Sequence, residues 1–167
     1  MVGQLFVGRD RQVAELRSGL GDALAGHGAL FMIDGESGIG KTRLAYELAL
    51  EAAQRGARVV WGSAWEAGGA PPFWPWVQVL RELVGGMTDR DRPRLRETLA
   101  ASAPYVAQLV PDVRAALPDL PPAPALESEQ ARFGVFDAIA TFLRERAREH
   151  PLVLVLDDLQ WADEPSL

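Results

Sequence analysis

The sequence predicts an α/β fold in which helices cover both faces of a parallel sheet, giving three layers. Three observations support this. The largely apolar runs 29–33, 58–61 and 152–156 have the length of buried strands. Stretches whose apolar residues have helical spacing lie between these runs. A glycine-rich stretch directly follows the first run, where a strand would turn into a helix.

The first predicted helix begins near Asp10, a residue type that caps helix N-termini. Apolar residues recur three or four positions apart along it, which places them on one face. They are Val13, Leu16, Leu20 and Leu24. Gly26 and Gly28 are expected to end this helix, and the run 29–33 then forms the first strand.

A second helix is predicted to begin at Lys41 and to end at Gly56. Its apolar face consists of Leu44, Ala45, Leu48, Ala49 and Ala52. The run 58–61 follows as the second strand. Because the links between these elements are short, we expect a right-handed parallel strand–helix–strand unit.

Residues 67–126 are predicted to form a helical insertion between the second and third strands. Apolar spacing indicates a short helix around 77–84 and another around 95–99. Residues 117–124 contain four prolines in eight positions and cannot be regular. The chain is therefore divided at 1–66, 67–126 and 127–167.

The last helix is predicted to begin at Glu127 or Ser128 and to be broken by Pro151. One face is expected to carry its apolar residues. They are Phe133, Phe136, Ile139, Phe142 and Leu143. The third strand, 152–156, follows and ends in the acidic pair Asp157 and Asp158.

Composition excludes several classes of protein. With a net charge of -6, the chain has no overall basic field to hold a nucleic-acid backbone or an anionic membrane. It has no cysteine, which excludes disulfides and thiolate metal sites. The start has no cationic leader, and the apolar runs are far shorter than a membrane span, so we expect a soluble, cytoplasmic protein.

The stretch GESGIGKT matches the phosphate-binding pattern G-x-x-x-x-G-K-[ST] at every fixed position. Its residues are Gly35, Glu36, Ser37, Gly38, Ile39, Gly40, Lys41 and Thr42. Glycines let backbone N–H groups turn toward phosphate oxygens, and a helix N-terminus adds free donors. The alternative is a chance glycine-rich turn, but the motif follows a predicted strand and opens a helix, as this chemistry requires.

Lys41 is the only lysine in a chain that otherwise uses arginine. A flexible ammonium suits the β- and γ-phosphates better than a planar guanidinium, so we expect Lys41 to contact them. Thr42 would give its hydroxyl to Mg²⁺. The absence of a second lysine also excludes the [NT]-K-x-D element that reads guanine, which favours an adenine nucleotide.

The acidic pair is the second candidate site. A carboxylate at the carboxyl end of a buried parallel strand faces the crevice where ligands bind. Asp157 would hold Mg²⁺ opposite Thr42, and Asp158 would orient or deprotonate an attacking water. Taken alone, either residue is better explained as a helix cap or a solvated turn, and the metal and water roles depend on the nearby phosphate-binding pattern. The two histidines, the five tryptophans and the arginine run near residue 92 are interpreted as solvated or packing residues.

Three stretches together resemble the STAND group, the signal-transduction ATPases with numerous domains, within the AAA-type P-loop NTPases. They are LFVGRDRQVAEL, GESGIGKTRLAYELA and LVLVLDDLQWADEPSL. More narrowly, the chain looks like the ATPase module of large LuxR-type transcriptional regulators and related actinobacterial signalling proteins. The resemblance implies that Phe6, Val7, Gly8 and Arg9 lie near the adenine. It also implies that residues 35–43, including Arg43, bind the phosphates of ATP.

The resemblance carries further expectations. The family's sheet continues beyond Leu167, so the chain is expected to be an N-terminal fragment with an incomplete sheet. Full-length relatives self-associate on ATP binding and contact DNA only through a C-terminal domain. Many strongly hydrolysing relatives carry glutamate at the position of Asp158, so slow hydrolysis is expected. The alternatives are an ATP-driven motor or a phosphotransferase acting on a separate substrate, and a scaffold that no longer binds nucleotide.

Overall fold

The computed structural model describes residues 10–66, 69–85, 90, 92–122 and 129–167. It consists of two compact units, residues 1–59 and 60–167. The boundary falls inside the strand β1, Arg58–Ser63, most of which belongs to the second unit. Within the part of the chain that is described, no helix is long and apolar enough to cross a membrane.

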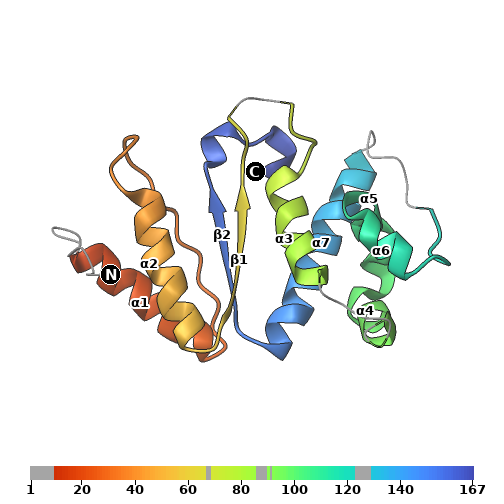
Figure 1. The fold of residues 1–167 in the computed structure, drawn as a ribbon, viewed down its shortest axis with the longest axis horizontal. Helices are drawn as coiled ribbons and strands as arrows, with labels where there is room; N and C mark the ends of the chain where they lie inside the picture. Colours follow the sequence, from red (N-terminus) through yellow and green to blue (C-terminus); the bar gives the residue numbers. More distant parts are fainter. Residues whose placement is uncertain (1–9, 67–68, 86–89, 91, 123–128) are drawn as a thin grey trace. The chain divides into compact units, whose positions relative to one another are not determined.

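The first unit is a pair of helices, α1 (Asp10–Leu24) and α2 (Lys41–Gln54), joined by a long loop (Figure 1). Leu16 and Leu20 of α1 are buried, as predicted from their spacing. Arg17 Nε donates to Glu51 Oε2 at 2.7 Å and links the two helices. At the end of α2, Gly56 has φ 86°. This left-handed glycine ends the helix, as predicted.

The predicted strand at 29–33 is wrong, because these residues have no strand conformation. Leu30 is 95% exposed and Met32 is 87% exposed. The sheet in the described residues pairs only β1 with β2 (Leu152–Asp157), so the run 29–33 does not share in a hydrogen-bonded ladder. Phe31 instead lays its ring against α1, so close that a Cβ added at Gly19 would lie 2.3 Å from it.

The second unit contains the two-stranded parallel sheet (Figure 1). Both strands occur where apolar runs predicted them, and Asp157 is the last residue of β2. Helix α3, Trp74–Val84, begins very close to β1: a Cβ added at Gly62 would lie 2.3 Å from the carbonyl oxygen of Pro75. Glycine at this position is therefore required by the close approach of two backbones.

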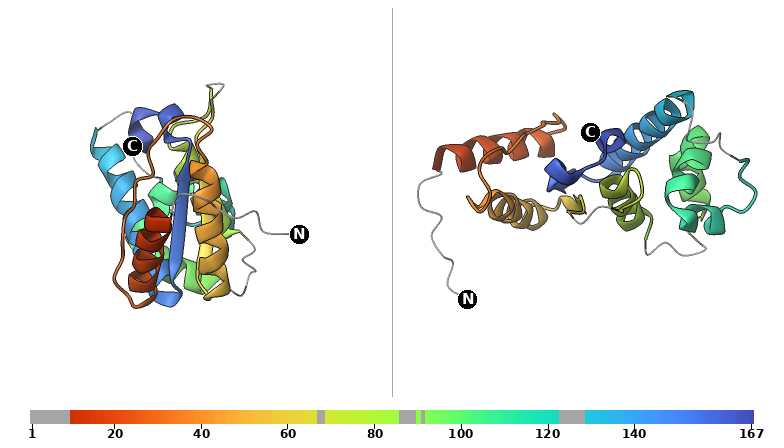
Figure 2. Two further views of the ribbon diagram at one scale, coloured as in Figure 1. Left: turned by 90° about the vertical axis from the view of Figure 1, so that its left-hand side faces the viewer. Right: turned by 90° about the horizontal axis from the view of Figure 1, so that it is seen from above.

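Between β1 and β2 the described residues form more helices than the sequence indicated. The helices expected in the insertion are α3 and α4 (Arg92–Leu99). Two further short helices, α5 (Ala103–Leu109) and α6 (Pro111–Ala116), each have a proline at their first or second position, which suits a helix start. Residues 117–122 form no helix, as the prolines indicated. Figure 2 shows these helices grouped beside α7, Glu129–Glu149.

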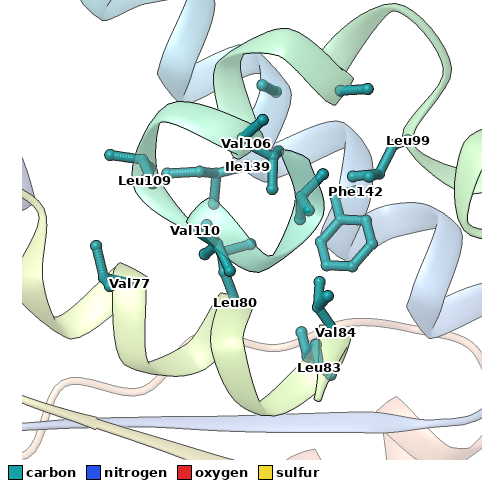
Figure 3. Packing of buried hydrophobic residues seen from close by; sticks show 14 of the residues in the cluster. Val77, Leu80, Leu83, Val84, Leu99, Val106, Leu109, Val110, Ile139 and Phe142 are labelled. Carbon is teal, nitrogen blue, oxygen red and sulfur yellow. The ribbon is translucent and has the colours of Figure 1, made fainter. Parts of the chain in front are cut away.

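The core of the second unit lies between α3, the short helices and α7. Figure 3 shows the apolar residues of α3 facing those of α7 and of the segment 103–110. They include Val77, Leu80, Leu83, Val106, Val110, Ile139 and Phe142. Their burial explains why the insertion folds as part of this unit, since each short helix is too short to be stable alone.

The apolar face predicted for α7 is partly wrong. Phe133 is 70% exposed, and Phe136 is 42% exposed. The buried residues are instead Ala131, Val135, Ala138, Ile139 and Phe142. This face is selected by the neighbouring helices, because Tyr105 of α5 packs so tightly on Gly134 that a Cβ there would lie 2.4 Å from its ring.

Candidate functional site

The glycine-rich stretch forms a turn that leads directly into α2. Three of its glycines have positive φ: Gly35 at 148°, Gly38 at 77° and Gly40 at 94°. A Cβ added at Gly38 would meet nothing within 4 Å, so the backbone angle is what favours glycine there. The loop therefore adopts a path that side-chain-bearing residues rarely follow.

The N-terminus of α2 lies at the end of this turn. Gly40 precedes the helix, and its carbonyl oxygen accepts the N–H of Leu44 at 3.0 Å. The first N–H groups of a helix have no acceptor within the helix and carry partial positive charge. Thr42 and Arg43, in this first turn, both have exposed side chains, and Arg43 pairs with Glu47 at 3.2 Å.

Lys41 reaches back over the turn. Its Nζ donates to the carbonyl oxygens of Gly35 at 2.8 Å and Glu36 at 3.0 Å. Glu36, Ser37 and Ile39 have exposed side chains. The ammonium is thus held by backbone oxygens at the start of the same motif, where it closes the turn.

The four residues expected near the adenine, Phe6 to Arg9, lie outside the described residues. The phosphate loop belongs to the first unit and the acidic pair to the second. The predicted placement of Asp157 opposite Thr42 therefore stays a prediction.

The acidic pair lies at the carboxyl end of β2. Asp157 ends the strand and is partly exposed, whereas Asp158 is exposed. Asp157 Oδ1 accepts the N–H of Asp158 at 3.0 Å. Asp158 has φ 57° and ψ 32°, a left-handed conformation that is uncommon for a residue with a side chain. Gln160 Nε2 donates to Asp158 Oδ1 at 3.0 Å.

The segment after the acidic pair is tied to the start of α3. Asp163 Oδ2 accepts the N–H of Phe73 at 3.2 Å, and the Ser166 hydroxyl donates to its other oxygen. The carbonyl oxygen of Ser166 accepts from Trp76 Nε1 at 3.0 Å. The bond between Asp163 and Phe73 joins residues 90 positions apart. A local pattern cannot reveal that contact.

The described side chains contain no group of three or more His, Cys, Asp or Glu residues placed to hold a metal ion. Mg²⁺ commonly uses one or two protein oxygens together with phosphate oxygens and water. The donor set expected here, a threonine hydroxyl and one carboxylate, fits that mode.

The comparison with protein families decides the class of this chain. A family model described as AAA ATPase domain matches residues 5–167. The chain belongs to this family. The matched range includes the glycine-rich turn, the acidic pair and the N-terminal stretch around Arg9. No curated protein and no solved structure matches the chain.

Membership of the AAA ATPase domain family bears out the coarse prediction of a P-loop ATPase module. It supports ATP as the nucleotide and Mg²⁺ as the accompanying ion. It also agrees with the mixed helix and strand architecture around a parallel sheet.

Proposed function

We propose that this AAA ATPase domain binds Mg-ATP and hydrolyses it slowly, as the nucleotide switch of a multidomain signal-transducing transcriptional regulator. The observation that carries the proposal is the arrangement of Lys41. The only lysine of the chain extends over a turn of left-handed glycines, at the N-terminus of a helix.

The turn has the donors that a triphosphate needs. The N-terminus of α2 offers N–H groups and partial positive charge. Among the described residues, the bonds of Lys41 Nζ go to two neutral carbonyl oxygens, and phosphate oxygens can replace these because they bring full negative charge to the ammonium. We assign residues 35–43 to the phosphates, and Phe6 to Arg9 to the adenine by family resemblance.

Thr42 and Asp157 are the proposed ligands of Mg²⁺. The Thr42 side chain is exposed at the start of α2, and Asp157 Oδ1 accepts the adjacent N–H of Asp158. Both groups supply the oxygen donors that Mg²⁺ prefers. When bound, the ion would neutralise phosphate charge and orient the triphosphate.

Asp158 is the proposed residue for water activation, with Lys41 stabilising charge on the phosphates. The Asp158 carboxylate is exposed, and Gln160 occupies only one of its oxygens. The other oxygen can accept a proton from water. An aspartate is one methylene shorter than the glutamate expected of fast enzymes, which supports slow turnover and a switching role.

The regulatory role and the ATP-dependent self-association rest on the resemblance to LuxR-type regulators. The test is to measure Mg-ATP binding by calorimetry, turnover by phosphate release, and mass by analytical ultracentrifugation with and without nucleotide. We expect binding, slow turnover and a larger assembly with ATP. Fast steady turnover stimulated by a small substrate would favour the alternative, a motor or phosphotransferase. Absence of nucleotide binding would refute the proposal.

A further inference from the structure

Two residues with side chains have left-handed backbones in the part of the chain that is described. They are Phe73, with φ 64°, and Asp158, with φ 57°. Such conformations are unfavourable for residues with a side chain and persist only where surrounding contacts fix them. Phe73 is also almost completely buried and directly precedes α3, so its position is fixed by the core.

Local contacts hold Asp158 on both sides. On the strand side, Ala64 N–H donates to the carbonyl oxygen of Asp157 at 3.1 Å. On the other side, Trp161 N–H donates to the carbonyl oxygen of Asp158 at 2.9 Å, closing the short 3-10 turn Leu159–Trp161. A single turn of this kind is weakly stable by itself, so it needs an anchor beyond it.

Asp163 provides that anchor. One carboxylate oxygen accepts the N–H of Phe73, and the other accepts the Ser166 hydroxyl. Ser166 is only 5% exposed, and its carbonyl oxygen is bound by Trp76 of α3. The Phe73 ring is in turn fixed edge-on to Phe136 of α7, with ring centroids 5.6 Å apart. The segment after Asp158 is thus attached to the buried core of its unit.

We propose that Asp163 is a positioning residue for ATP hydrolysis, which keeps Asp158 in its left-handed conformation with its carboxylate presented to water. This inference rests on the proposed role of Asp158. Asp163 acts through the chain that joins it to Asp158, since its two carboxylate oxygens bond Phe73 and Ser166. The side chain must be short and must offer two polar atoms, since it bonds the Phe73 N–H and the Ser166 hydroxyl together.

The chemistry of this anchor suggests a matched pair of variants. Asp163→Ala removes both bonds. Asp163→Asn keeps the size of the side chain: its amide oxygen can accept from Phe73, and its amide NH₂ can donate to the Ser166 oxygen. The asparagine variant therefore restores the anchor without the charge.

The experiment measures kcat and KM for ATP hydrolysis, the dissociation constant of Mg-ATP and the melting temperature in the full protein. We expect Asp163→Ala to lower kcat about 10- to 100-fold, as expected when a reacting group is displaced by about 1 Å. The Mg-ATP dissociation constant should stay within about twofold, because the loop that binds phosphate is intact. Asp163→Asn should recover most of kcat, and Asp163→Ala should cause no further loss in an Asp158→Ala background.

Several results would overturn the inference: unchanged kcat in Asp163→Ala, no recovery in Asp163→Asn, or no measurable hydrolysis by the unaltered protein despite Mg-ATP binding. Failure of the unaltered protein to bind Mg-ATP would instead refute the proposed function. If Asp163→Ala does not fold, Trp76→Phe takes its place. That variant loses the bond to Ser166 and part of a ring that packs against the core, so its melting temperature is measured beside its kcat. It should lower kcat with unchanged Mg-ATP binding, and an unchanged kcat would again contradict the inference.

Discussion

The Nζ atom of Lys41 lies 2.8 Å from the carbonyl oxygen of Gly35, six residues earlier in the same turn. The Lys41 ammonium therefore donates to backbone oxygens of the same turn that is expected to bind phosphate. Exchange of these neutral backbone acceptors for phosphate oxygens favours the nucleotide, because the ammonium then faces full negative charges in place of carbonyl dipoles. This arrangement makes Lys41 the residue on which nucleotide binding is expected to depend most.

Replacement of Lys41 by arginine should not preserve the affinity for Mg-ATP, although it keeps the positive charge. A planar guanidinium cannot enter the turn as a compact point charge, so we expect Lys41→Arg to weaken Mg-ATP binding about tenfold or more. The matched control is Arg55→Lys at the far end of α2, which should leave affinity unchanged. Equal affinity of Lys41→Arg and the unaltered protein would contradict this expectation. Fluorescent nucleotide titration provides the comparison.

Asp157→Asn should affect the metal more than the nucleotide. Loss of one carboxylate charge weakens Mg²⁺ binding, while the phosphate loop keeps its own contacts. We expect the Mg²⁺ concentration for half-maximal ATP binding to rise about tenfold, with metal-free ATP affinity nearly constant. Asp112→Asn, on the surface of α6, serves as the charge control. If the Mg²⁺ requirement and the metal-free ATP affinity worsen by the same factor, Asp157 is not a ligand of the metal.

Gly62→Ala should destabilise the fold strongly. Its Cβ would lie 2.3 Å from the carbonyl oxygen of Pro75, a backbone atom that cannot move without shifting α3. We expect a loss of about 1–3 kcal/mol in the free energy of unfolding, measured by urea denaturation. Gly28→Ala is the control, because nothing lies within 4 Å of its added Cβ. If both variants have the same free energy of unfolding, α3 does not approach β1 as described.

The pKa of Asp119 is held below its usual value mainly by the hydrogen bond from Arg96, whose Nη2 lies 2.5 Å from Oδ1. Arg96→Gln should therefore raise the pKa of Asp119, observable by NMR titration. Because the folded-state pKa is lowered, this pair stabilises the fold above the unfolded-state pKa, and the contribution is lost as the pH falls through the folded-state pKa. The pair is exposed, so the effect on melting should be small. An unshifted titration in Arg96→Gln would show that another group sets this pKa.

Periodicity and local chemistry predicted the elements whose stability is local or self-contained. Helices α1 and α2 followed from apolar spacing and from the glycine after α2, and β1 and β2 followed from apolar runs. The glycine-rich turn was predicted because its residue types and order are tied to one chemistry. These inferences needed no knowledge of distant contacts.

Elements that depend on distant partners could not be predicted. The run 29–33 is as apolar as a strand, but a strand also needs a neighbour to share its hydrogen bonds. Phe133 has the right spacing for burial, yet the face of α7 is chosen by what packs against it. The bond between Phe73 and Asp163 spans 90 residues, and no local pattern encodes it.

The decisive measurement is calorimetric titration of Mg-ATP into the protein and its Lys41→Ala variant. Each charge-assisted bond to phosphate is worth about 1.5–3 kcal/mol, so loss of the ammonium should weaken binding about 10- to 150-fold. Arg55→Ala, which removes an arginine at the other end of the same helix, should bind as tightly as the unaltered protein. Unchanged affinity in Lys41→Ala would contradict the assignment of this turn as the phosphate site.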